Sequence, residues 1–267
     1  MGEETLVGKL KATFSDLIAL ASAAALVCVD LVLHASGPAA QKRRLLLAFA
    51  ITVIFAMAAW LARGVNGSGA LAGSAIAFVM AERDVRLFWV LLLVFAVTLA
   101  ATRAGKSRKH ALKAEEAPGG RTAAQVMANL GIAGLITVAA PETWPVLAVA
   151  ALAEAAADTC SSEVGMAYPG KTVLLTSWKP VSPGVDGGVS LRGTLAAVIA
   201  AALISGAAVA LKLVPQHFTL AIIYAGLLGS LVDSLIGALL ERRGMLSNDV
   251  VNLLSTAAAV GIMWLMM

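Results

Sequence analysis

The chain has 267 residues, of which 60% are hydrophobic and 13% are charged. Soluble globular domains are about half apolar and about a quarter charged, so this composition excludes an ordinary soluble domain and indicates a polytopic membrane protein. The formal net charge is +4, and the basic residues stand in short clusters between apolar segments. That arrangement is typical of a topology signal and argues against nucleic acid as a partner.

Nine apolar segments approach the length of about 20 residues that a membrane span needs. The first five cover residues 17–33, 45–61, 66–80, 87–101 and 122–140. The last four cover residues 144–160, 191–214, 218–240 and 250–267. The third is short and rich in small residues, so a re-entrant segment is its alternative. We expect one integral membrane domain over residues 1–267, an all-α bundle of about nine transmembrane helices.

Two polar connections separate these spans, a basic one at 103–121 and a Gly/Pro-rich loop at 165–190. Because lysine and arginine in short loops mark the cytoplasmic side, we expect both connections, and the basic turn at 241–243, to be cytoplasmic. The basic cluster at 42–44 then lies outside, whereas it would move inside if the third segment were re-entrant. We favour nine full spans because they place every polar motif at the cytoplasmic face.

The cysteines and histidines predict neither a disulfide framework nor a zinc site. Cys28 and Cys160 lie far apart and form no C-x-x-C motif, and His34, His110 and His217 lack the spacing of metal ligands. The N-terminus is acidic where a signal peptide is basic, so we expect the first apolar segment to be retained.

Three carboxylates stand at the end of the sixth span, at Glu154, Asp158 and Glu163. Ionisable groups inside a membrane are costly and commonly functional. Glu154 and Asp158 share a helix face, whereas Glu163 reaches Asp158 only if the helix ends between them. Paired carboxylates beside a loop suit Mg²⁺, which takes few carboxylates together with water and substrate phosphates. The alternative is an ion pair with Arg121 or Arg192 that locks the bundle.

Polar residues also form stripes on two other spans. Arg121, Gln125 and Asn129 are each four residues apart, which places them on one face of the fifth span. Guanidinium and amide groups suit a phosphate or a base edge, although amides also hold membrane helices together. In the eighth span, Asp233 stands within a stripe of small residues that permits close helix approach.

Glycine and asparagine mark the starts of three other spans. Gly187 and Gly188 precede the seventh span, where backbone N–H groups can approach an anion. No Walker A sequence is present, and a Gly-rich loop alone is more often only a turn. Asn66 and Asn248 stand where the third and ninth spans begin, so each is either a ligand or an N-cap.

Six motifs follow one another in a fixed order along the chain. They are NGSGA at 66–70, RTAAQVMAN at 121–129, ADTCSSEVG at 157–165, GGVSLRGT at 187–194, GSLVDSLIG at 229–237 and NDVVN at 248–252. Over roughly residues 45–267, the chain resembles the membrane-protein family that includes the plant chloroplast phytyl-phosphate kinase and the animal transmembrane protein 19. The resemblance implies phosphorylation of an isoprenyl monophosphate to the diphosphate by a nucleoside triphosphate. CTP is the favoured donor because related lipid-alcohol kinases use it.

On this hypothesis Asp158, Glu163 and Asp233 hold Mg²⁺ on the donor phosphates, and Arg121 neutralises phosphate charge. The other residues predicted to bind substrate or nucleotide are Asn66, Ser68, Gln125, Asn129, Thr159, Ser162, Lys179, Gly187, Gly188, Ser190, Arg192, Asn248, Asp249 and Asn252. The alternative function is a transporter or flippase of a lipid phosphate or a small anionic substrate, which can use the same carboxylates and small-residue helices. A purely structural partner in a membrane complex has less need of so many buried polar groups.

Overall fold

The computed structural model describes residues 2–34, 39–111, 119–139, 142–168 and 170–267. Residues 112–118 of the predicted basic connection therefore lie outside the described residues, as do residue 140 of the predicted fifth span and residue 169 of the predicted loop. The described part is almost entirely helical, which confirms the predicted all-α class.

Ten α-helices and one short hairpin make up this described part. The helices are α1 (Gly2–His34), α2 (Ala39–Leu61), α3 (Gly67–Arg83), α4 (Val85–Arg103), α5 (Lys106–Ala111), α6 (Ala123–Ala139), α7 (Trp144–Ala167), α8 (Leu191–Ala210), α9 (Thr219–Leu239) and α10 (Asn248–Leu265). Strands β1 (Thr172–Leu174) and β2 (Gly188–Ser190) pair antiparallel, and the 3₁₀ turns η1 (Gln216–Phe218) and η2 (Glu241–Arg243) flank α9.

Nine of the described helices, all except α5, correspond to the nine predicted spans. Six of them, α1, α2, α4, α8, α9 and α10, are long and apolar enough to cross a membrane by length and composition. The helices α3 and α6 are shorter, with 17 residues each, and α7 carries the three carboxylates. The chain is therefore a polytopic helix bundle, as predicted.

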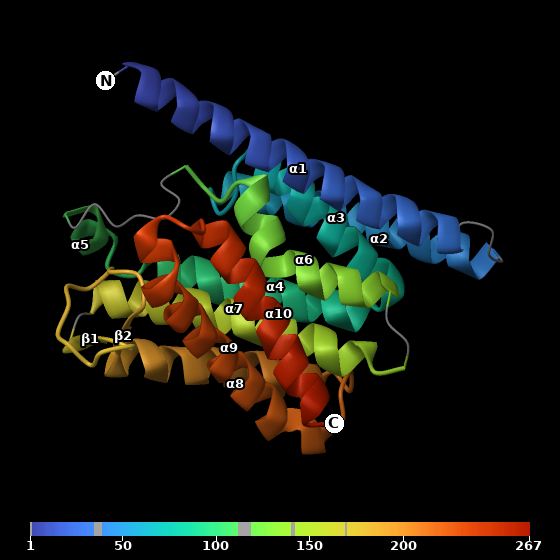
Figure 1. Cartoon of the computed structure of the whole chain (residues 1–267). Helices are drawn as coiled ribbons and strands as arrows, with labels where there is room; N and C mark the ends of the chain where they lie inside the picture. Colours follow the sequence, from blue (N-terminus) through green and yellow to red (C-terminus); the bar gives the residue numbers. More distant parts are fainter. Residues whose placement is uncertain (1, 35–38, 112–118, 140–141, 169) are drawn as a thin grey trace.

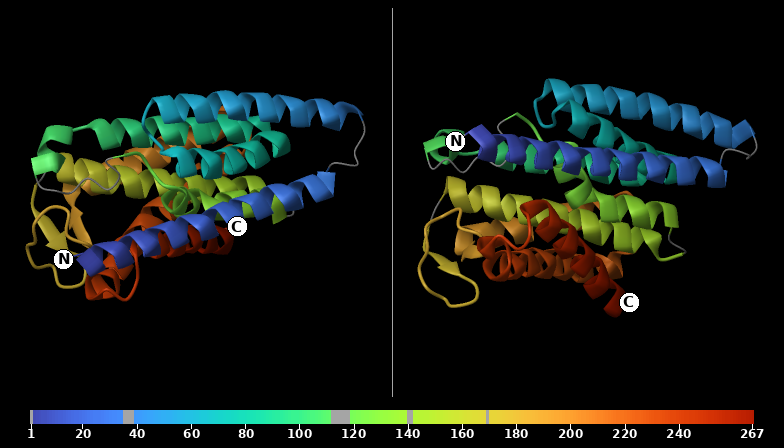
Figure 2. Two further views of the ribbon diagram at one scale, coloured as in Figure 1. Left: turned by 90° about the horizontal axis from the view of Figure 1, so that it is seen from above. Right: turned by 45° about the horizontal axis from the view of Figure 1, so that its top comes forward.

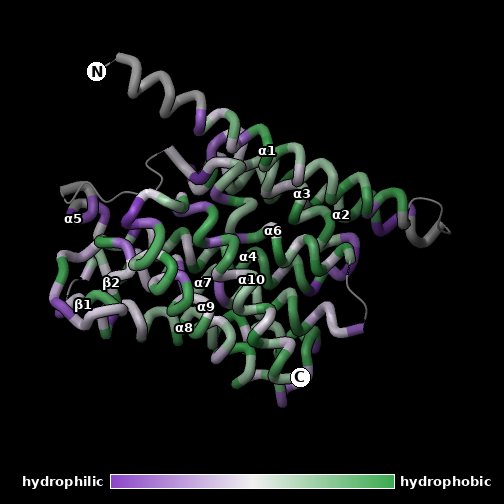
Figure 3. The backbone as a smooth tube through the Cα atoms, viewed as in Figure 1, coloured by the Kyte–Doolittle hydropathy of each residue, from purple (hydrophilic) through white to green (hydrophobic). Residues whose placement is uncertain are grey.

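The helices run back and forth along one axis (Figure 1). Figure 2 shows from two further directions that α5 and the two strands lie at one end of the bundle, while α2 begins at the other. Hydrophilic residues gather around α5 and the strands, and the helical bodies are mostly hydrophobic (Figure 3). We call the end that carries α5, β1, β2 and η2 the polar end.

Helix α7 is the centre of the bundle, because α4, α6, α8, α9 and α10 all pack against it. The run Ala148–Ala153 is fully buried. Membrane helices associate without a hydrophobic driving force, and small residues such as alanine let their backbones pack closely. A Cβ at Gly226 of α9 would lie 3.2 Å from the backbone of Ala153, so these two helices are nearly in backbone contact.

One predicted boundary is wrong, and so is one of the two alternative roles predicted for Asn248. The sixth span does not end at residue 160, since α7 continues to Ala167 and Tyr168 N still donates to Val164 O (2.9 Å). No proline occurs between residues 146 and 168, so nothing breaks the helix there. A Cβ at Gly165 would be only 3.3 Å from Ser190 Oγ, so glycine lets this last turn lie against the start of α8. Asn248 is not an N-cap, because Ser247 takes that position.

Helices α3 and α6 begin side by side, inward from the polar end (Figure 1). The segments that precede them pair in parallel: Asn66 N donates to Arg121 O (3.0 Å), and Arg121 N donates to Gly64 O (3.1 Å). Gly69 is required here, because a Cβ would collide with the carbonyl oxygen of Arg121. Asn66 Oδ1 accepts from Gly69 N (2.8 Å), which confirms the predicted N-cap. We call this contact the α3–α6 junction.

Asp16 of α1 joins both helix starts. Its Oδ1 accepts from Ala124 N of α6 (3.0 Å), and its Oδ2 accepts from Ser68 Oγ of α3 (2.7 Å). The first N–H groups of a helix have no partner within that helix, and a carboxylate there also interacts favourably with the helix dipole. Nothing in the sequence pattern singled out this residue.

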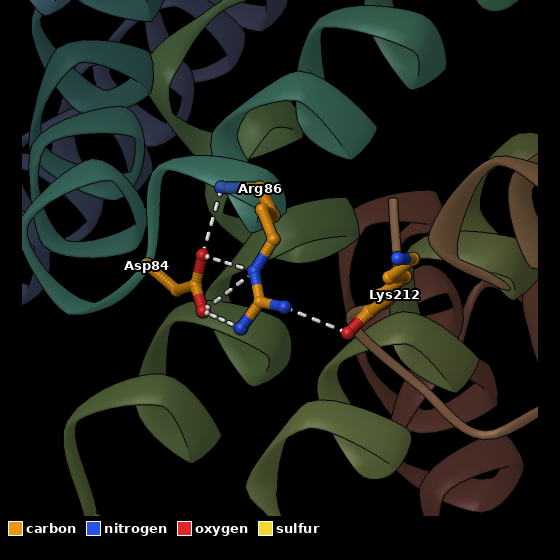
Figure 4. Close-up of polar contacts among 3 residues, drawn as sticks. All are labelled: Asp84, Arg86 and Lys212. Carbon is orange, nitrogen blue, oxygen red and sulfur yellow. Dashed lines mark hydrogen bonds and ion pairs between the residues drawn. The ribbon is translucent and has the colours of Figure 1, made fainter. Parts of the chain in front are cut away.

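The turn between α3 and α4 lies at the opposite end of the bundle and is fixed by Asp84 (Figure 4). Asp84 Oδ1 caps α4 by accepting from Arg86 N (2.9 Å), and Oδ2 accepts from Arg86 Nη2 (2.6 Å). Arg86 Nη1 also donates to Lys212 O (2.7 Å), which ties this turn to the end of α8. Burial raises the pKa of Asp84, but the hydrogen bonds and charge of Arg86 outweigh it, so the pKa lies below its ordinary value.

Replacing Asp16 by alanine tests the clamp on the α3–α6 junction. Asp16→Ala removes a charged acceptor from two donors, which should cost about 2 kcal/mol of stability. We expect a lower melting temperature for the detergent-solubilised protein. The control is Ser22→Ala on the same helix, where the exposed hydroxyl contacts only Ile18 O. Equal melting temperatures for the two variants would contradict the clamp.

The Asp84 pair predicts a pH-dependent stability. Because the pKa of this carboxyl is lowered in the fold, its contribution is fully present above the unfolded value of about 4 and is lost as the pH falls through the lowered value. Asp84→Asn should therefore melt below the wild type at about pH 7, and the difference should narrow toward about pH 3. Glu142→Gln, an exposed carboxylate at the same end, is the control. A constant difference across this range would refute the prediction.

Candidate functional site

A cavity that is partly open to the surroundings lies between α2, α3, α4, α6, α7, α9 and α10. Ten of the residues predicted for the site line it: Arg121, Gln125, Asn129, Asp158, Thr159, Ser162, Glu163, Asp233, Asn248 and Asn252. They come from four helices and from the segment before α6, so the fold joins residues that are up to 131 positions apart (252 minus 121). We call this space the main cavity.

The predicted stripe on α6 lies along the wall of the main cavity. Arg121 Nη2 donates to Thr159 Oγ1 of α7 (3.1 Å), which fixes the guanidinium across the gap between the helices. Gln125 Oε1 accepts from Thr122 N (3.0 Å), and Gln125 N donates to Thr122 Oγ1 (3.4 Å). This reciprocal pair is a capping box. Gln125 thus serves the start of α6 as well as lining the cavity.

Two carboxylates reach the main cavity from different helices. Asp158 is half-buried at the end of a fully buried stretch of α7, and its Oδ1 lies 3.5 Å from the donating Ser230 Oγ of α9. Asp233, one turn further along α9, lines the same space. In the described part of the chain, no group of three His, Cys, Asp or Glu side chains could hold a metal ion. The metal role of Asp158, Glu163 and Asp233 therefore remains a prediction.

Glu163 lines the main cavity but is held by a lysine. Lys109 Nζ of α5 lies 2.6 Å from Glu163 Oε2, and it also donates to Thr102 O (2.6 Å) and Ala101 O (3.2 Å). Only 2% of the Lys109 surface is exposed. A locking ion pair was the alternative role for these carboxylates, and Glu163 forms one with Lys109, a partner that was not predicted. The regular helix at Glu163 explains why it does not join Asp158.

Glu154 lies outside the main cavity, buried between α7 and α10. Its carboxylate accepts from Ser255 Oγ (2.8 Å) and Thr256 Oγ1 (2.7 Å). A Cβ at Gly229 of α9 would lie 2.5 Å from Glu154 Cγ, so the absence of a side chain there makes room for this residue. Glu154 of α7 therefore packs against α9 and forms hydrogen bonds to α10, so it links three central helices.

The Gly-rich loop lines a second cavity at the polar end. It shares Ser162, Asp233 and Asn248 with the main cavity, so the two are neighbours. Gly187 has φ of +76°, and a Cβ there would press on the backbone of Ala238. Ser190 Oγ accepts from Gly193 N (3.2 Å) and caps α8. These two residues therefore have structural roles at the predicted phosphate loop.

The structure does not bring the other predicted residues to the main cavity. Asn66 and Ser68 belong to the α3–α6 junction, and Lys179 is exposed in the hairpin. Arg192 lines an apolar groove between α4, α7 and α8, where its Nη1 donates to Tyr168 O (3.1 Å). Asp249 faces α1.

Sequence reasoning missed residues that line or support the main cavity. Arg63 is an exposed, positively charged residue in the lining of the cavity. Lys109 binds Glu163 of the lining, and Asp16 binds the start of α6. Phe55 and Phe95 supply apolar lining. No periodicity marked them, because each acts through a contact with a distant part of the chain.

A family model for the integral membrane protein family DUF92 matches residues 50–260. An uncharacterised membrane protein of Methanocaldococcus jannaschii is 32% identical over 217 residues, which cover 80% of this chain and 90% of the relative. Protein PGR of Arabidopsis thaliana is 29% identical over 76% of this chain and 81% of its own length. The chloroplastic protein VTE6 of the same plant is 28% identical over 63% of this chain and 54% of its own length. No solved structure matches significantly.

The Lys109–Glu163 pair gives a stability prediction. Lys109→Met leaves a buried carboxylate without its cation, which typically costs about 3–5 kcal/mol. The double variant Lys109→Met/Glu163→Gln should recover part of that loss, because no buried charge is left. The control is Lys106→Met, an exposed lysine on the same short helix. Melting curves in detergent measure all three, and a Lys109→Met curve that overlays the control would disprove the buried pair.

Proposed function

Because the chain belongs to the DUF92 family of integral membrane proteins, we propose that it is a membrane-embedded phosphotransferase. It converts an isoprenyl monophosphate, phytyl phosphate being one example, to the diphosphate with a nucleoside triphosphate and Mg²⁺. The family resemblance supports the lipid substrate and favours CTP as the donor. The observation that carries the proposal is the convergence of cationic, amide and carboxylate side chains on one large cavity within a membrane bundle.

The lining of the main cavity has a polar part and an apolar part. Its polar lining comes from α7, α9, α10 and the start of α6, while α2 and α4 contribute mostly apolar side chains. A nucleotide with charged phosphates and a lipid with an apolar tail need such a divided lining.

The chemistry requires little covalent participation by the protein. An oxygen of the lipid monophosphate attacks the γ-phosphorus of the donor, the bond from that phosphorus to the β–γ bridging oxygen breaks, and the nucleoside diphosphate leaves. A phosphate monoester has its second pKa near about 6, so the attacking oxygen is already deprotonated near neutral pH. The lining within the described residues contains no histidine, which is consistent with a reaction that needs no general base.

Arg121 is the residue best placed to hold phosphate charge. One of its N–H groups is used by Thr159, and a guanidinium has five in a planar fork that matches phosphate oxygens. Arg63 lines the same cavity and can add a second positive charge. Both side chains would orient the reacting phosphates and oppose the negative charge that builds up during transfer.

Asp158 and Asp233 fit Mg²⁺, since this ion binds through one or two carboxylates together with water and substrate phosphates. Their carboxylates line one cavity from two helices, and Ser230 supports Asp158. The ion would neutralise charge on the donor phosphates. Glu163 is engaged by Lys109, so in this proposal it positions α5 beside the cavity.

We place the polar end in the cytoplasm, where nucleoside triphosphates are available. The loops at this end carry Lys171, Lys179, Arg242 and Arg243, as the positive-inside rule favours for short cytoplasmic loops. At the other end, the charge of Arg86 is compensated by Asp84, and the basic cluster at 42–44 then lies outside. The second cavity opens beside these basic loops and would admit the nucleotide.

The α3–α6 junction favours one second candidate. Helices that begin inside a bundle and direct their N-termini at an anion are typical of secondary transporters. A flippase or transporter of a lipid phosphate would move its substrate across proteoliposomes without consuming nucleotide. Flux without nucleotide hydrolysis or transfer would favour this candidate over the kinase.

The sharpest test of the kinase is turnover with radiolabelled CTP and an isoprenyl monophosphate. Asp158→Asn keeps the shape of the side chain and removes its charge, so we expect kcat/KM to fall by about 100-fold or more. Glu142→Gln, an exposed carboxylate at the far end of the bundle, should keep full turnover. Full activity of Asp158→Asn would eliminate the assigned metal role, and the absence of transfer from any nucleotide would eliminate the kinase.

A further inference from the structure

The main cavity has an apolar arm that the phosphate chemistry does not use. We define this apolar arm by Phe55 and Ala59 of α2, Gly73 of α3, and Leu91, Val94 and Phe95 of α4, all of which line the cavity. These residues contribute only aliphatic and aromatic side chains, and none at Gly73, so they suit a hydrocarbon better than a charged nucleotide.

Aromatic rings close the outer side of the apolar arm. Phe55 of α2 packs edge-on against Phe95 of α4, with ring centroids 5.4 Å apart, and also against Phe88 at 5.6 Å. Exposed apolar residues beside Phe55, such as Ile54 and Met57, face away from the bundle. A lipid tail could thus enter from the bilayer by rotation of side chains, without moving a helix.

The glycines along the cavity wall are not equivalent. A Cβ at Gly64 would lie 2.7 Å from the ring of Phe95, and one at Gly69 would collide with the backbone at Arg121. Close packing therefore requires both. A Cβ at Gly73, one turn further along α3, would meet only Val126 Cγ1, at 4.0 Å, which is ordinary van der Waals contact. Packing does not require glycine at position 73, which lines the main cavity beside Val126 of α6.

We propose that the apolar arm holds the isoprenoid tail of the substrate and that Gly73 determines how long a tail fits. This inference rests on the proposed function, because it assigns the lipid half of the same site. A tail that leaves the bilayer for the arm exchanges one apolar environment for another, so hydrophobicity alone selects no chain length. Selection must come from shape, and the residue at position 73 controls the shape of the arm.

The test compares three monophosphates of increasing length, geranyl, farnesyl and geranylgeranyl. Gly73→Leu fills the arm, and we expect kcat/KM for geranylgeranyl monophosphate to fall by about tenfold or more, with less than about twofold change for geranyl monophosphate. Gly73→Ala should show a smaller effect of the same pattern, and it keeps the test valid if the leucine variant does not fold. The control is Gly206→Leu, the same change at an exposed position of α8 where a Cβ meets nothing within 4 Å.

Binding without nucleotide separates this inference from the proposed function. Thermal shift with each lipid monophosphate alone should show stabilisation of the wild type that Gly73→Leu loses for the longest tail only. If this loss of stabilisation is seen but no nucleotide supports turnover, the kinase is rejected and the tail site is retained. Turnover by Gly73→Leu that is unchanged, or reduced equally for all three lengths, would reject the tail site and leave the kinase standing.

Discussion

The structure depends on satisfying two parallel helix starts inside a membrane bundle. The first N–H groups of α3 and α6 point the same way, and the positive ends of both helix dipoles lie next to each other. In an apolar environment each unsatisfied group is expensive. Asp16 offsets this cost with one carboxylate shared between the helices, while Asn66 and the Thr122–Gln125 pair serve one start each. Because the junction is fixed in this way, the Arg121 side chain reaches Thr159 of α7. The main cavity lies beside this contact, between α6, α7 and the neighbouring helices.

Much of the fold follows from the sequence because hydropathy and span length are local properties. The nine apolar segments predicted nine helices closely, and Asn66 was recognised as a possible cap from its position before an apolar run. The end of α7 was missed because a glycine at position 165 normally signals a loop, and only the packing of α8 against it explains why the helix continues. The pairing of Lys109 with Glu163 joins residues 54 positions apart, and no local pattern encodes it.

The sequence also predicted many residues of the candidate site, but it did not predict their structural roles. A spacing of four residues predicted Arg121, Gln125 and Asn129 on one helix face. Gln125 and Asn129 lie on α6, whereas Arg121 precedes the helix, and all three line a cavity shared with Asp158 and Asp233. The sequence did not reveal how much of this polarity is structural. Gln125 and Ser190 cap helices, and Gly187 fits against α9. Ligand and cap demand the same residue types, so composition alone could not separate them.

The contact between Glu154 and Gly229 constrains how this chain can evolve. A glutamate in α7, a glycine in α9 and two hydroxyls in α10 occupy one shared volume, so none of them can change size or polarity alone. A relative that replaced Glu154 by alanine would remove the nearest atom to a Cβ at position 229, leaving Ala259 Cβ (2.8 Å) as the remaining obstacle, and it would release the hydroxyls at positions 255 and 256 from their acceptor. Substitutions at these four positions should therefore occur together across the family, as compensated exchanges and not as independent drift.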